Sequence, residues 1–110
     1  MIQHRDLADG RWWELSLAEQ LGNVGSEISR AIKWQGRQPD LAERALHRAL
    51  ELLDLTRMDP RWRQSLPRLR ELSRAREVVV DYLAGSNEYG STAASLQKYF
   101  DAYALVARRR

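Results

Sequence analysis

The sequence predicts an all-α protein folded as an up-down antiparallel four-helix bundle. Three observations lead to this prediction: apolar residues recur at helical spacing in four segments, helix-start signals precede these segments, and the connections between them are short. The predicted helices lie near 16–35, 40–57, 66–84 and 92–107. Because the connections are short, successive helices are expected to run antiparallel.

The length and composition indicate one domain. A chain of 110 residues can bury a core without a disulfide or a metal, and the absence of cysteine excludes thiolate chemistry. We expect a single helical-bundle domain over 1–110, with an irregular lead-in over 1–14 and a basic tail over 108–110. The formal net charge of +3 comes from that tail, because the rest of the chain has fifteen basic and fifteen acidic residues. This charge-balanced body does not clearly offer a nucleic-acid-binding surface.

The sequence gives no sign of targeting or of a membrane segment. The first fifteen residues include Arg5, Asp6, Asp9 and Arg11 and no apolar run, so no signal peptide is visible. No apolar stretch approaches membrane-spanning length. We therefore expect a soluble cytoplasmic protein that does not associate with a membrane and binds no cofactor.

The first predicted helix begins with the capping box Ser16-Leu17-Ala18-Glu19. Just before it, Trp12 and Trp13 are expected to plug one end of the bundle, because Trp gives large burial at a partly wet position. The edge of the buried face carries side chains that can meet a partner or a ligand: Gln20, Asn23, Glu27 and Trp34. Gly22 and Gly25 each lower helix stability by about 1 kcal/mol relative to Ala, which favours close packing against a neighbouring helix.

The second predicted helix follows the break at residues 36–39 and restarts at Asp40-Leu41-Ala42-Glu43 in the same capping pattern. Its leucines and alanines cover an arc wide enough for two neighbours, and Leu46 is expected to be buried. The opposite face carries Asp40, Glu43, His47, Glu51 and Asp54. Such a line can hold a metal in a bundle. Here it is centred on the solvent side, so we predict a solvated face and no metal site.

The third predicted helix follows a turn at Met58–Trp62 that Pro60 forces. Ser65 is its expected cap, Pro67 lies in its first turn, and Gly85 is the expected left-handed C-cap. Its apolar stripe, in which Leu72 should be buried, also contains Arg76. A guanidinium cannot lose its charge, so Arg76 has to find a partner, line a cleft or face another chain. We predict that Arg76 is partly buried and pairs with Glu27.

The last predicted helix is capped by Ser91 or Thr92. Its apolar face is a stripe that we interpret as core: Leu96, Tyr99, Phe100, Tyr103, Val106 and Ala107. An aromatic stripe at this spacing is far more often core than a cofactor site.

The segment Arg76-Glu77-Val78-Val79-Val80-Asp81-Tyr82, on the third core helix of a small four-helix bundle, resembles the HEPN superfamily. The motif of that family is an Arg with a polar neighbour, a short gap, a His and a nearby Tyr. Here Asp81 takes the position of the His, Tyr82 follows it at once, and the histidines His4 and His47 lie outside this helix. The resemblance implies a homodimer and a partner nucleotidyltransferase of the toxin–antitoxin type. Active members of the family are ribonucleases.

Three hypotheses for function remain open. In the first, a HEPN-like protein with little or no catalysis partners a nucleotidyltransferase and binds nucleotide, RNA or that partner at a groove formed by Arg76, Asp81, Tyr82, Glu27 and Asn23. In the second, an active ribonuclease uses Asp81, although a solvated Asp titrates far below neutral pH. In the third, the chain is a helical homodimer or scaffold and Arg76 is structural. We favour the first, and hence binding with weak catalysis or none.

Overall fold

The computed structural model describes residues 10–109, whose regular secondary structure consists of helices and includes no strand. The first nine residues of the predicted lead-in and Arg110 of the predicted basic tail lie outside this range. In chain order the described elements are the 3-10 turn η1 (Arg11–Glu14), α2 (Leu17–Trp34), α3 (Pro39–Arg57), the one-turn helix α4 (Pro60–Arg63), α5 (Leu66–Leu83) and α6 (Ala93–Arg108). The all-α prediction is confirmed, and the bounds of the long helices agree with the predicted ones to within one residue.

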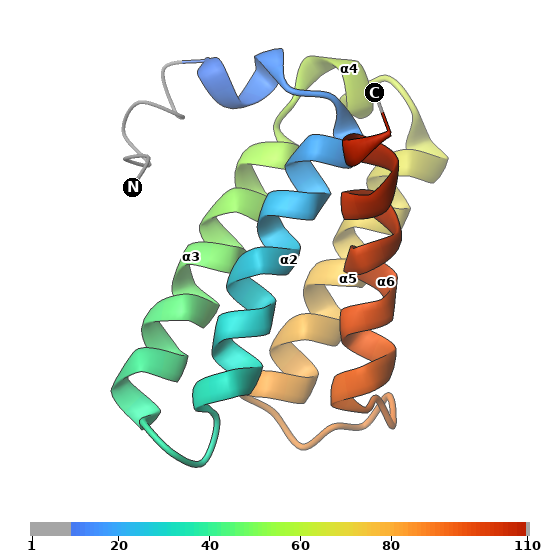
Figure 1. Ribbon diagram of the computed structural model, residues 1–110. Helices are drawn as coiled ribbons and strands as arrows, with labels where there is room; N and C mark the ends of the chain where they lie inside the picture. The colour runs from blue at the N-terminus through green and yellow to red at the C-terminus, as the bar shows by residue number, and fades with distance from the viewer. Residues whose placement is uncertain (1–9, 110) are drawn as a thin grey trace.

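The four long helices of the described range lie alongside one another, and successive ones run in alternate directions (Figure 1). Helix α2 packs closely against both α3 and α6, whereas α5 packs on α3 and α4. The turn η1 and helix α4 lie together at one end of the molecule (Figure 1). No helix in residues 10–109 has the length and apolar character needed to cross a membrane.

Side-chain caps start three of the long helices as predicted. Ser16 Oγ accepts from Glu19 N at 3.1 Å, and the Glu19 carboxylate accepts from Ser16 N at 2.9 Å. Ser65 caps α5, and Thr92 caps α6. The predicted cap at Asp40 is wrong, because α3 begins at Pro39 after Gln38, which makes no side-chain cap bond. The fixed φ of proline suits the first helical position, where its missing N–H is not needed.

The structure corrects two further details of the predicted connections. The turn before α5 contains a helix, α4, whose start is capped by Asp59 Oδ1 accepting from Arg61 N at 2.9 Å. Gly85 is not a left-handed C-cap, since the positive φ after α5 is at Asn87, with φ 57°. Gly85 is needed for a different reason: a Cβ there would lie 3.0 Å from the Asp81 carbonyl oxygen.

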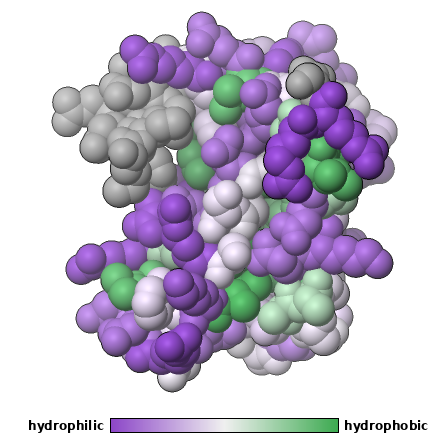
Figure 2. Space-filling model, viewed as in Figure 1, coloured by the Kyte–Doolittle hydropathy of each residue, from purple (hydrophilic) through white to green (hydrophobic). Residues whose placement is uncertain are grey.

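The core is made mainly by α2 and α3, to which α5 and α6 add fewer buried side chains. Leu46 and Leu72 are buried, as predicted. A Cβ at Gly25 would lie 2.7 Å from Cβ of Phe100, and one at Gly22 would lie 3.2 Å from Cα of Ala104, so both glycines allow close approach of α6. The packing interpretation of these glycines is therefore confirmed. On the face shown in Figure 2, hydrophobic residues form separate patches among polar ones.

A buried polar network joins η1, α2, α3 and α4 at one end of the molecule. We call it the Gln20–Asp59 network; its members are Trp12, Gln20, Thr56, Asp59, Arg61 and Trp62. Gln20 is fully buried, not at the edge as expected, and donates to Asp59 Oδ2 at 3.0 Å while accepting from Trp62 Nε1 at 2.8 Å. Trp12 is 1% exposed and donates to Thr56 Oγ1 at 2.8 Å. Trp12, from the predicted lead-in, is thus part of the core.

Candidate functional site

Arg76 is paired and partly buried, as predicted, but its predicted partner is wrong. Its Nε donates to Asp54 Oδ1 at 2.8 Å and its Nη2 to Asp54 Oδ2 at 3.4 Å. The Arg76 side chain is 34% exposed. Asp54 therefore does not belong to a purely solvated face of α3, because α3 turns this carboxylate towards α5.

A second guanidinium binds the same carboxylate. Arg57 Nη1 donates to Asp54 Oδ1 at 3.2 Å, while Arg57 Nε is buried and has no hydrogen-bond partner among the described residues. We call this group the Arg57–Asp54–Arg76 cluster. Because one carboxylate faces two guanidiniums, its three side chains have a net charge of +1.

Glu27 is occupied by other arginines. It is buried between α2 and α3, where its carboxylate accepts from Arg30 Nη1 at 3.1 Å and from Arg48 Nε at 3.2 Å. Asn23 lies on the exposed face of α2 and donates to the carbonyl oxygen of Glu19 at 2.8 Å. Neither residue contacts Arg76 through a hydrogen bond.

Asp81 has a structural task at the end of α5. Its Oδ1 accepts from Glu88 N at 2.8 Å and its Oδ2 accepts from Tyr89 N at 3.0 Å, so both oxygens hold the loop before α6. The interpretation of Asp81 as a solvated helix charge therefore needs correction. Tyr82 is half-buried and packs against the core. The structure thus places the five predicted groove residues in different surroundings.

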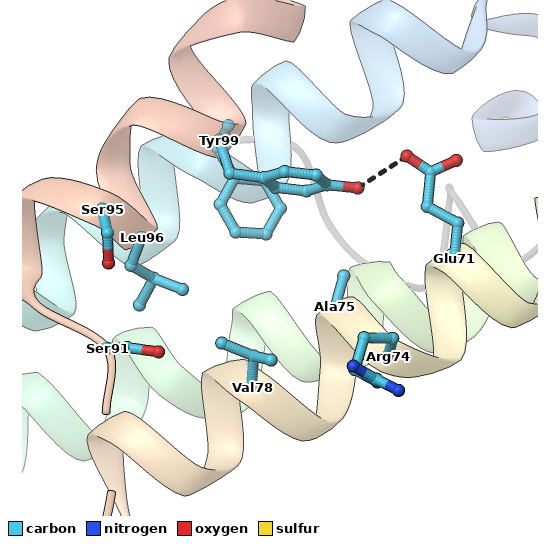
Figure 3. Close-up of a pocket in the computed structure, with 9 residues that line it drawn as sticks. Glu71, Arg74, Ala75, Val78, Ser91, Ser95, Leu96 and Tyr99 are labelled. Atoms are coloured by element: carbon cyan, nitrogen blue, oxygen red, sulfur yellow. Dashed lines mark hydrogen bonds between the residues drawn. The ribbon is translucent and has the colours of Figure 1, made fainter. Parts of the chain in front are cut away.

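A cavity that the sequence does not reveal lies between α5 and α6. It has a volume of about 240 Å³. We call it the α5–α6 cleft, and its lining residues are Glu71, Arg74, Ala75, Val78, Ser91, Ser95, Leu96, Tyr99 and Phe100. Val78 and Leu96 point towards each other across it (Figure 3). Its walls are therefore mainly apolar.

The packing of the helices explains why this side stays open. Gly22 and Gly25 draw α6 close to α2, while α5 packs on α3 and α4. The connection over 84–92 is long enough to let α6 lie apart from α5. Small side chains at Ala75 and Ser91 then leave the space between the two helices unfilled.

Glu71 is the charged group at one end of the cleft, where the hydroxyl of Tyr99 points at it (Figure 3). Its Oε2 accepts from Tyr99 Oη at 2.9 Å and from Tyr103 Oη at 2.7 Å. Its Oε1 accepts from Arg68 Nη1. The Glu71 side chain is 34% exposed, so this carboxylate and the groups bonded to it lie at the border between cleft and solvent.

These bonds decide the protonation states around the cleft. Burial is the largest single influence on Glu71 and by itself would raise its pKa, but the bonds from Tyr103, Tyr99 and Arg68 outweigh it and hold the pKa below its ordinary value. Burial, then the bond to Glu71, raises the pKa of Tyr99. At neutral pH the carboxylate is ionised and the phenol is protonated. Neither group is suited to proton transfer near neutrality.

One signal in the sequence points to the bonds that Tyr99 and Tyr103 make with Glu71. Tyr99 and Tyr103 lie four residues apart on one face of the predicted helix. A tyrosine on a core-facing stripe normally needs a hydrogen-bond partner for its hydroxyl. The pattern therefore indicates an acceptor on the neighbouring helix, although it does not say which residue provides it.

Comparisons with protein-family models, with curated proteins and with solved structures find no match to this chain. In the described residues no group of three or more His, Cys, Asp or Glu side chains is placed to hold a metal ion. The features that bear on function are therefore the Arg57–Asp54–Arg76 cluster, the α5–α6 cleft and the segment 76–82 of α5.

Proposed function

We propose that this chain is a non-catalytic, HEPN-like binding protein that partners a nucleotidyltransferase and recognises an anionic group at the Arg57–Asp54–Arg76 cluster. The observation that carries the proposal is the sharing of Asp54 by Arg57 and Arg76, which leaves a net positive charge and a buried Arg57 N–H without an acceptor. A phosphate or carboxylate would supply the missing negative charge, because guanidinium groups bind such oxygens strongly and both guanidiniums are partly exposed.

The helical framework and the HEPN-like segment support the choice of partner. Four long helices in alternate directions fit the up-down four-helix bundle that the resemblance implies. Arg76 lies on α5 with Glu77 beside it and Tyr82 near the helix end, which matches the Arg, the polar neighbour and the nearby Tyr of the family motif, whereas Asp81 stands where that motif has His. A minimal nucleotidyltransferase is the partner that this resemblance implies, and a nucleotide or RNA is the corresponding anionic ligand.

The bonds of Asp81 favour binding over ribonuclease activity. Both Asp81 oxygens accept from backbone N–H groups of the following loop, so this carboxylate is engaged in holding the loop. A general acid–base catalyst for RNA cleavage needs a group that exchanges a proton near the working pH. We therefore expect purified protein to leave RNA uncleaved.

Titration calorimetry with ATP and with a short single-stranded RNA tests the proposal. Arg76→Met and Arg57→Met should each weaken binding strongly, because each removes a cationic donor from the cluster. Arg70→Met is the matched control, since Arg70 is an exposed arginine on the same helix α5. Binding should also weaken with added salt, as phosphate contacts do. Equal binding by all three variants, or RNA cleavage that needs Asp81, would contradict the proposal.

A second candidate is a helical homodimer or scaffold with a structural Arg76. One observation favours the structural role of Arg76, namely that Asp54 of the same chain already meets its charge. The charge of Arg76 therefore gives no reason for a second chain, and the homodimer rests on the HEPN resemblance alone. Light scattering at tens of micromolar protein tests the homodimer, and a monomer there would rule it out as the working state.

A further inference from the structure

We propose that the α5–α6 cleft binds a small uncharged aromatic molecule that carries one N–H or O–H donor. The cleft shares no residue with the Arg57–Asp54–Arg76 cluster, so this inference does not depend on the function proposed above. It rests on the size of the cleft, on the rings in its wall and on the hydrogen-bonding state of its polar end.

The size of the cleft fits a two-ring molecule. Its volume is about 240 Å³. A protein cavity of about 150 Å³ lined by aliphatic and aromatic side chains holds benzene. The α5–α6 cleft therefore has room for a bicyclic aromatic compound such as indole, and it is open enough on one side to admit it.

The wall of the cleft favours a flat aromatic body. The rings of Tyr99 and Phe100 are 5.0 Å apart and nearly perpendicular, at 88°. A flat ligand can therefore stack with an offset on one ring and meet the other edge to face, which are the two favourable arrangements of aromatic pairs. Val78 and Leu96 close the space from opposite helices (Figure 3).

The polar end of the cleft calls for a donor on the ligand. The Tyr99 hydroxyl already gives its proton to Glu71, so its oxygen can only accept a further bond. The Glu71 carboxylate is likewise an acceptor and uses three of its roughly four acceptor positions. A ligand group that only accepts hydrogen bonds would therefore meet no donor on Tyr99 or Glu71.

The charges near this end favour a neutral ligand. The Glu71 carboxylate is already paired with the Arg68 guanidinium, so the pair has no net charge. The other cation at the cleft, Arg74, lies over the ring of Tyr89, 5.5 Å from its centroid. An added anion would stand close to Glu71, and an added cation would compete with Arg68.

Four indole compounds separate these features: indole, 1-methylindole, tryptamine and indole-3-acetate. Their binding to the full chain is followed by NMR through the methyl signals of Val78 and Leu96. Indole should give saturable shifts there and bind about fivefold more tightly than 1-methylindole, which lacks the donor. It should also bind more tightly than the cationic tryptamine and the anionic acetate.

Two pairs of variants locate the site. Ala75→Phe fills the cleft and should abolish saturable binding, whereas Ala102→Phe, on the exposed face of α6, should not. Val78→Phe serves the same purpose if Ala75→Phe changes the circular dichroism spectrum. Tyr99→Phe should remove the preference for indole over 1-methylindole. Tyr103→Phe is its control, because Tyr103 also donates to Glu71 but does not line the cleft.

Each of the following results would overturn the proposal. None of the four compounds gives saturable shifts at Val78 and Leu96, or the Phe variants at 75 and 78 bind like the native chain. Tryptamine or the acetate binds most tightly, or 1-methylindole equals indole. A dimer of the native chain that Ala75→Phe dissociates would also overturn the proposal, because a second copy of the chain would then occupy the cleft.

Discussion

Two regions of this small protein treat buried polar groups in opposite ways. In the Gln20–Asp59 network, Gln20 and Asp59 are fully buried and bonded on all sides, and Trp12 fills the space beside them. In the α5–α6 cleft, the carboxylate of Glu71 is only partly buried, and the apolar walls beside it enclose about 240 Å³.

The difference comes from the side chains that each region receives. Large indole rings from η1 and α4 close the first region, and their N–H groups match acceptors on α2 and α3. The second region receives small residues, Ala75 and Ser91, and its helix α6 is held close to α2 through Gly25. One set of helices thus forms both a closed end and an open side, and the open side is the one available to a ligand.

The largest expected effect is in the closed region. Trp12→Ala should lower the free energy of unfolding by about 3–5 kcal/mol, because it empties a fully buried volume and leaves Thr56 without its donor. Trp34→Ala is the control, since Trp34 is only half-buried, and it should cost clearly less. Urea unfolding at neutral pH measures both, and equal losses would show that the network does not close this end.

The next largest expected effect is on how the stability of the protein depends on pH through Asp59 of the network. Burial alone would raise the pKa of Asp59, but bonds from Arg61 and Gln20 outweigh it and lower the pKa. The ionised Asp59 therefore contributes stability that is fully present above the pKa of an unfolded-state Asp, which is about 4. That stability is lost as the pH falls through the lower pKa that Asp59 has in the folded protein.

Asp59→Asn tests this assignment. The variant should be about 1–3 kcal/mol less stable at pH 7. That deficit should shrink on acidification, because only the native chain loses an ionised carboxylate. Urea midpoints measured from neutral to acidic pH give both slopes. A deficit that stays constant down to acidic pH would assign the acid sensitivity to other groups, such as Glu71.

The approach of α6 to α2 gives a smaller effect. Gly25→Ala should lower the free energy of unfolding by about 1–2 kcal/mol, because the new methyl group would lie 2.7 Å from Cβ of Phe100. Gly22→Ala should be close to neutral, since its contact of 3.2 Å is milder and alanine improves helix propensity by about 1 kcal/mol. Thermal unfolding distinguishes the two, and the reverse order would mean that Gly25 is not what sets the distance between the helices.

The smallest expected effect is at Arg76. Arg76→Met should change the free energy of unfolding by about 1 kcal/mol or less, because the pair is partly exposed and Arg57 still binds Asp54. Asp54→Leu should cost more, since it leaves two guanidiniums without their shared carboxylate. If Arg76→Met were the more damaging change, the shared-carboxylate description would be wrong.

The local signals in the sequence predict the long helices well. Ser16, Ser65 and Thr92 each cap a helix through a side-chain bond to a backbone N–H three residues later, which depends on neighbouring residues alone. The obligate charge of Arg76 also predicts a partner correctly. The identity of that partner, Asp54, depends on how α3 is rotated against α5. The apolar periodicity of each helix taken alone does not determine that rotation.

The candidate cleft depends on distances between helices and is therefore harder to predict. The periodicity assigns Tyr99 and Phe100 to a core face, but it does not say that α6 packs closely along α2 and lies farther from α5. Asp81 shows the same limit, since its partners are backbone N–H groups of the loop at Glu88 and Tyr89. A wheel diagram of the helix cannot include such groups.

The most direct test of the open α5–α6 side is a comparison of Ala75→Leu with Ala49→Leu by urea unfolding. Ala49 lies in the fully buried core, so added atoms there should lower the free energy of unfolding by about 1–3 kcal/mol. Ala75 faces the cleft, so the added methyl groups should enter unfilled space and leave stability unchanged or raise it by about 1 kcal/mol. If Ala75→Leu instead lost as much stability as Ala49→Leu, the space between α5 and α6 would be packed and no ligand site would exist there.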